Sequence, residues 1–101
     1  MNAPRDVSYE ETVVDMLKAD PEFAAVYLAA ALEEVEQPGG QTALLAVLRQ
    51  LAEAQGMASV AERAGLPRES LYRALSPRGN PTLKTLLALL NATGLRLGVQ
   101  A

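Results

Sequence analysis

The chain has 101 residues, of which 50% are hydrophobic and 21% are charged, and this size and composition are typical of one globular domain with a single core. It contains no cysteine, histidine or tryptophan, which excludes disulfide frameworks, thiolate zinc sites, thiol nucleophiles and histidine bases. We therefore expect no enzymatic activity, no cofactor and no metal, and the lack of a long apolar run or a signal-like start predicts a cytoplasmic protein without a membrane span.

The net charge of −3 combines two halves of opposite sign. Residues 1–54 carry ten acidic and three basic side chains, for a formal charge of −7, whereas residues 55–101 carry six basic and two acidic ones, for +4. This division favours two surfaces with two different partners. A chance distribution of solvated charge is the alternative.

The first half of the chain predicts a tail and three helices. Residues 1–8 have no hydrophobic period and are expected to form a flexible tail before one helical domain over 9–101. Helices are predicted over about 9–18, from Asp20 as N-cap to the acidic cluster at 33–36, and from about 42 to 56. On the second helix, one face is expected to pack inward: Phe23, Tyr27, Ala30 and Ala31.

The end of the chain predicts a last helix and one strand. Thr82 is expected to cap a helix that ends at Gly94, with its leucine stripe in the core: Leu83, Leu86, Leu87 and Leu90. After Gly94 the apolar residues alternate with polar ones, which is typical of a strand. Because no other segment has strand spacing, we expect the strand to pair with a second copy in a C2 homodimer, the alternative being a frayed tail.

Residues 57–76 have the spacing of a helix-turn-helix, on a skeleton of Ala61, Gly65, Leu66, Leu71 and Ala74. Two crossing helices need a small residue such as Ala61 at their contact, and Gly65 permits a left-handed backbone at the turn. Val60, Ala64 and Leu75 are also expected to face inward. The outer face of the second helix, predicted over 67–75, would then carry Arg68, Glu69, Tyr72 and Arg73.

These four side chains suit the major groove of DNA, where arginine pairs with guanine, glutamate accepts from cytosine N4 and tyrosine meets thymine or phosphate. Further DNA contacts are expected from residues before and after that helix: Ser59, Arg78, Asn80, Thr82 and Lys84. Ser59 stands three residues before Glu62, which also predicts a capping box at the start of the first helix. An ordinary exposed surface is the alternative for each residue taken singly.

Three segments, 27–34, 68–76 and 79–83, resemble the probable addiction module antidote proteins, a branch of the lambda-repressor-like (Xre-type, HigA-like) helix-turn-helix antitoxins. The resemblance covers residues 24–97, although Ala58 and Pro67 stand where serine is usual. It implies an all-α bundle of about five to six helices, to which the alternating segment would add a short C-terminal strand.

The same resemblance implies the antitoxin of a type II toxin–antitoxin module, which binds double-stranded operator DNA, represses its own operon and neutralises a small basic toxin of the RelE/ParE-like type. The acidic cluster of Glu33, Glu34 and Glu36 is then a candidate for toxin contact by complementary charge. The alternative function is a helix-turn-helix that serves as a protein-interaction module without DNA binding.

Overall fold

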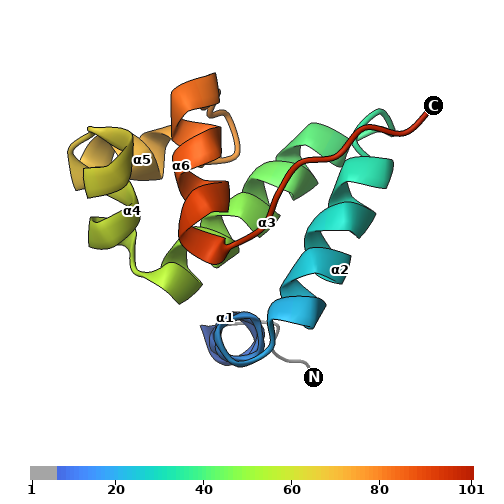
Figure 1. Cartoon of the computed structure of the whole chain (residues 1–101), viewed down its shortest axis with the longest axis horizontal. Coiled ribbons are helices and arrows are strands. Elements are labelled where there is room, and N and C mark those ends of the chain that lie inside the picture. The colour runs from blue at the N-terminus through green and yellow to red at the C-terminus, as the bar shows by residue number, and fades with distance from the viewer. Residues whose placement is uncertain (1–6) are drawn as a thin grey trace.

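Six helices make up the described part of the chain, residues 7–101 of a computed structural model (Figure 1). They are α1 (Val7–Ala19), α2 (Pro21–Glu33), α3 (Gly40–Gln55), α4 (Met57–Ala64), α5 (Arg68–Ala74) and α6 (Leu83–Thr93). The predicted all-helical fold class is confirmed. Residues 7 and 8 belong to α1 rather than to the expected tail, and residues 1–6 of that tail lie outside the described residues.

Helix α3 lies at the centre of the molecule and packs against α1, α2, α4 and α6. Figure 1 shows α1 and α2 on one side of α3, with α4, α5 and α6 on the other. The inner face of α3 is formed by Leu45, Leu48, Leu51 and Ala52, which are all buried, while Leu44 beside them is half-buried. No helix within residues 7–101 combines the length and apolar character needed to cross a membrane.

The predicted helix starts at Asp20 and Thr82 are confirmed by their hydrogen bonds. An Asp20 carboxylate oxygen accepts from the backbone N–H groups of Glu22 (3.0 Å) and Phe23 (3.2 Å), and the Thr82 hydroxyl accepts from that of Thr85 (3.1 Å). Each side chain thereby satisfies donors that the first turn of a helix leaves without a partner. Local capping chemistry thus decides where α2 and α6 begin.

A partly buried polar bridge centred on Gln50 fastens α1 and α2 to α3. The Tyr27 hydroxyl donates to Oε1 of Gln50 (2.7 Å), and Nε2 of Gln50 donates to a carboxylate oxygen of Glu10 (2.9 Å). Gln50 is buried, so both bonds compensate for the removal of its amide from water. Burial, reinforced by neighbouring Tyr9 and Glu10, raises the pKa of Tyr27.

The buried face of α6 differs from the predicted leucine stripe. Leu83 and Leu87 are 67% and 48% exposed, and the buried positions are Thr85, Leu89 and Leu90. The reason is that α6 packs against α4 and α3, and the side turned to them contains Thr85, whose hydroxyl is satisfied by Thr82 (3.0 Å). On α2, Ala30 is exposed as well, while Ala24 and Leu28 are buried.

The predicted C-terminal strand is absent, since the described residues of the single chain contain no strand. The backbone N–H of Leu95 donates to the carbonyl of Leu90 (3.1 Å), and residues 96–101 continue without a helix or a ladder of hydrogen bonds. A strand exists only through pairing with another strand, and this all-helical chain offers no sheet edge. The alternating residues instead pass beside α2, where Leu97 and Leu32 line the same cleft.

Candidate functional site

The predicted pair of short helices is formed by α4 and α5, joined by residues 65–67. Gly65 has φ +72°, the left-handed conformation predicted for it, and the backbone N–H of Leu66 donates to the carbonyl of Ala61 (2.9 Å). The predicted inner face is buried at Val60, Ala61, Ala64, Leu71 and Leu75, whereas Leu66, also expected to face inward, is half-buried. The turn and the inner face together fix which side of α5 looks outward.

The outer side of α5 brings together the four predicted side chains Arg68, Glu69, Tyr72 and Arg73, all of which are exposed. Nη2 of Arg73 donates to the hydroxyl of Ser70 on the same helix (3.3 Å). The helix begins at Arg68, after Pro67 in an extended conformation that supplies no side-chain cap. Two guanidinium groups, one carboxylate and one phenol thus share an exposed helical surface of two turns.

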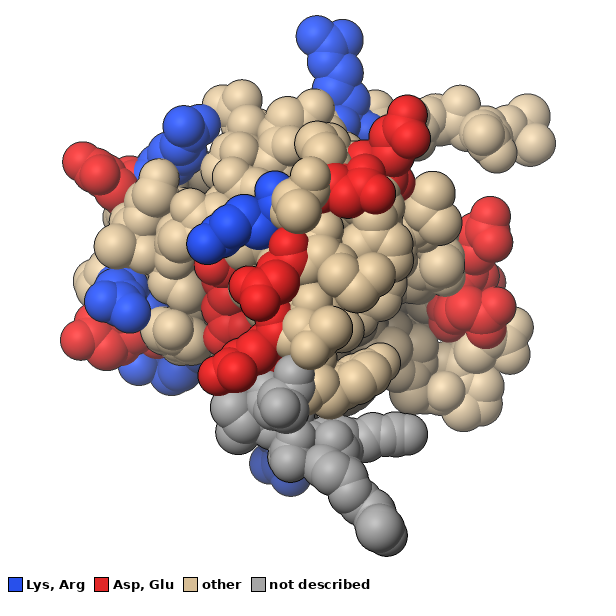
Figure 2. All heavy atoms as spheres, turned by 90° about the horizontal axis from the view of Figure 1, so that it is seen from below, with Lys and Arg blue, Asp and Glu red and all other residues tan. Residues whose placement is uncertain are grey.

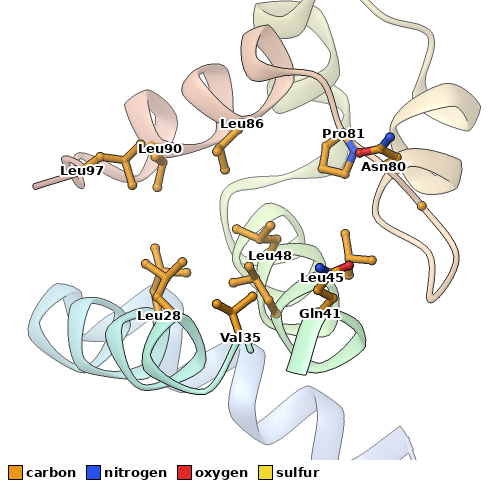
Figure 3. A pocket seen from close by; sticks show the side chains of 13 residues that line it. Leu28, Val35, Gln41, Leu45, Leu48, Asn80, Pro81, Leu86, Leu90 and Leu97 are labelled. Atoms are coloured by element: carbon orange, nitrogen blue, oxygen red, sulfur yellow. The ribbon is translucent and has the colours of Figure 1, made fainter. Parts of the chain in front are cut away.

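The five other predicted residues are all exposed: Ser59, Arg78, Asn80, Thr82 and Lys84. Ser59 is the third residue of α4 and Gly56 is its N-cap, so the predicted capping box is wrong. The Thr82 hydroxyl is occupied in capping α6. The Lys84 ammonium lies beside Gly65, and Asn80 is at one end of a pocket between α3 and α6 (Figure 3).

Arg49, which no sequence motif indicates as a site residue, holds the C-terminal end of α5 from helix α3. Its Nη1 donates to the backbone carbonyl of Leu75, the C-cap residue of α5 (3.1 Å). A cation at this end of a helix also complements the helix dipole. The one available sequence signal is that Arg49 is a basic residue among the apolar positions of α3. Its partner Leu75 lies 26 positions further along the chain, so no local pattern identifies it.

Gly79 supports the same end of α5 from the following loop. A Cβ atom at residue 79 would overlap the carbonyl group of Ala74 and lie 2.7 Å from the carbonyl oxygen of Arg73. The Ser76 hydroxyl also donates to the Arg73 carbonyl (2.8 Å). Close backbone packing and the Arg49 bond therefore fix α5 from two directions.

Charge is distributed unevenly over the surface. Figure 2 shows acidic side chains in a column through the middle of the lower face, whereas Lys and Arg lie mainly towards the side of α4 and α5. The predicted acidic cluster Glu33, Glu34 and Glu36 is exposed at the end of α2, across α3 from α5. Within the described range, no group of three or more acidic side chains is arranged to hold a metal ion.

These features define a small all-helical protein that exposes an arginine-bearing helix on one side of its central helix and an acidic helix end on the other. A family model described as "Probable addiction module antidote protein" matches residues 9–101. The chain belongs to this family, as the sequence resemblance predicted, and an antidote implies a toxin partner.

A relative in Haemophilus influenzae, described as an uncharacterized protein, is similar to this chain. The two are 39% identical over 69 residues, which span 68% of this chain and 71% of the relative. No solved structure matches the chain.

Proposed function

We propose that this chain is the antitoxin of a type II toxin–antitoxin module, that it acts without enzymatic activity, and that it represses its own operon and neutralises a RelE/ParE-like toxin. In this proposal α4 and α5 form a lambda-repressor-like helix-turn-helix, with α5 as the helix that enters the major groove. The single observation that carries it is the exposed outer face of α5, which is held in place by a buried inner face.

Each outer side chain of α5 has a role in reading DNA. Arg68 and Arg73 offer forked donors for guanine O6 and N7 or for phosphates, and Tyr72 can meet a thymine methyl group. Glu69 can accept from cytosine N4, but its charge opposes phosphate, so it selects among sequences rather than adding affinity. Arg78 is exposed and follows α5 closely, which supports a contact between its side chain and the phosphate backbone of the DNA.

The test is retardation of a fragment of the chain's own promoter, measured over a range of salt concentrations. Affinity should fall steeply, with a slope of roughly −0.9 per phosphate neutralised. Arg73→Ala should weaken binding by about 1–3 kcal/mol. Arg96→Ala is the matched control, because it removes the same charge from the tail, and it should change affinity by no more than about twofold.

A protein-interaction module without DNA binding is the second candidate. The net charge of −3 favours it, as do Glu62 on α4 and Glu69 on α5 among the basic groups, because acidic side chains repel phosphate. The retardation experiment separates the two functions. Absence of any complex with the promoter at low salt would support the interaction module.

We also propose that two copies bind one operator as a homodimer. Helix α5 has only 7 residues and can reach few base pairs, so a specific operator requires a second reading helix. The operator should then contain inverted half-sites about 34 Å apart, visible as a symmetric footprint. A monomeric mass in solution together with a single half-site footprint would contradict this part of the proposal.

For the toxin, we propose that Glu33, Glu34 and Glu36 attract a basic surface, chiefly by raising the rate of association. The three carboxylates are exposed at the end of α2, where complementary charge can act before contact. Reversing all three charges should slow association, and added salt should slow the wild type more than the reversed variant. Equal association rates for both proteins would refute this assignment.

A further inference from the structure

An apolar groove lies between α2 and α3 on one side and α6 with the C-terminal segment on the other. Figure 3 shows the side chains of its two walls facing one another, with Leu28, Val35 and Leu48 opposite Leu86, Leu90 and Leu97. The volume of this leucine groove is about 340 Å³. Gln41 and Asn80 mark its polar end.

The mouth of the leucine groove exposes large apolar side chains to solvent. Leu32 is 41% exposed and Leu97 is 51% exposed, and both line the groove. A dry apolar cavity of about 150 Å³ already binds a benzene molecule, so the groove has room for about two leucine-sized side chains. Burial of these walls by a partner would therefore remove apolar surface from water on both sides.

Charge at the rim indicates what kind of partner fits. Glu33 lines the neighbouring cleft together with Leu32 and Leu97, and Glu34 and Glu36 follow at the end of α2. Arg96 is the one cation among the residues that line this cleft. An occupant should therefore present aliphatic side chains flanked by lysine or arginine, because cations beside the apolar contact would meet the carboxylates.

A second copy of this chain fits the rim less well than a basic partner does. The chain is acidic, with a net charge of −3, and its exposed arginine-bearing face on α5 is assigned above to DNA. Two copies meeting at this groove would bring together two chains that each carry a net negative charge, which opposes their association. The toxin partner implied by the antidote family is then the occupant that the surface favours.

We propose that the toxin inserts two aliphatic side chains into the leucine groove, from a segment whose flanking Lys or Arg residues face the glutamates of α2. This inference rests on the proposed antitoxin function and extends it from the acidic cluster to an apolar anchor. The glutamates accelerate association, and the groove slows dissociation because separation re-exposes the leucines.

The experiment measures binding of the toxin, which a toxin–antitoxin module would encode next to this chain, by calorimetry and by association and dissociation rates. Leu32→Asp should weaken toxin binding at least about tenfold, chiefly through faster dissociation, since it places a charge in an apolar contact. Val26→Asp is the matched control on the same helix: Val26 is 67% exposed and lies outside the groove lining, so its change should have little effect.

Leu97→Asp is a second groove variant, in the segment after α6, where a charge does not interrupt a helix. Thermal unfolding of every variant establishes that the chains are folded. Unchanged toxin binding in both groove variants would overturn the groove assignment. A change of oligomeric mass without a change of toxin affinity would also overturn it, and would indicate a second copy as the occupant. Failure of the wild-type chain to bind the toxin would instead refute the antitoxin function and, with it, the groove.

Discussion

Gly79→Ala tests how tightly α5 is held by the loop that follows it. The added methyl group would overlap the Ala74 carbonyl and lie 2.7 Å from the Arg73 carbonyl oxygen, so the loop and the last turn of α5 must separate. Overpacking of this kind costs about 1–3 kcal/mol. We expect the free energy of unfolding to fall by about 2 kcal/mol, and the melting temperature by roughly 8–16 °C for a chain of this size.

The assay is thermal and urea unfolding followed by circular dichroism. Gly98→Ala is the matched control, because a Cβ atom at residue 98 meets no heavy atom within 4 Å and the backbone there does not have positive φ. That substitution should leave the melting temperature unchanged or raise it slightly. If Gly79→Ala melted within about 2 °C of the wild type, the close packing of this loop on α5 would be refuted.

The remaining predictions concern the bonds that hold the helices together. Arg49→Met should lower the free energy of unfolding by about 1–2 kcal/mol and weaken operator binding. The slope of operator affinity against salt should stay the same, because Arg49 contacts the protein rather than phosphate, and a reduced slope in retardation assays would contradict this. Tyr27→Phe removes the bond to Gln50 and should cost about 0.5–1.5 kcal/mol near neutral pH. Burial raises the pKa of Tyr27 in the folded chain, so the tyrosine of the unfolded chain ionises first as the pH rises. The wild type should therefore lose stability above about pH 10, and unfolding measured across pH should show no such loss in the Phe variant. Asp20→Ala should cost about 0.5–2 kcal/mol in urea unfolding, whereas Asp15→Ala, inside α1 and exposed, should cost less.

Helix boundaries were predictable where their cause is local. Asp20 and Thr82 cap the helices that follow them, and Gly65 and Gly94 end helices with positive φ, so each signal lies within a few residues of its effect. The buried face of α6 depends instead on where α3 and α4 lie. A leucine stripe did not reveal that Thr85, with its hydroxyl satisfied by the cap, would face the core.

The residues on the outer face of the candidate site could be predicted from the sequence, but the contacts that hold α5 in place could not. Burial of Leu71 and Leu75 follows from helical spacing, and the outward position of Arg68 and Arg73 follows from it. The bond from Arg49 to α5 spans 26 positions, and no local pattern indicates such a partner. The alternating residues after Gly94 were ambiguous, because an extended segment without a partner and a paired strand have the same sequence spacing.

Two adjacent residues of α3 connect the two sides of the molecule. Gln50 bonds to Tyr27 of α2 and Glu10 of α1, while Arg49 bonds to the end of α5. Neighbouring positions on a helix point about 100° apart, so a single turn of α3 can hold α1 and α2 on one side and α5 on the other. These three bonds make one turn of α3 the part of the fold to which both sides of the molecule are fastened.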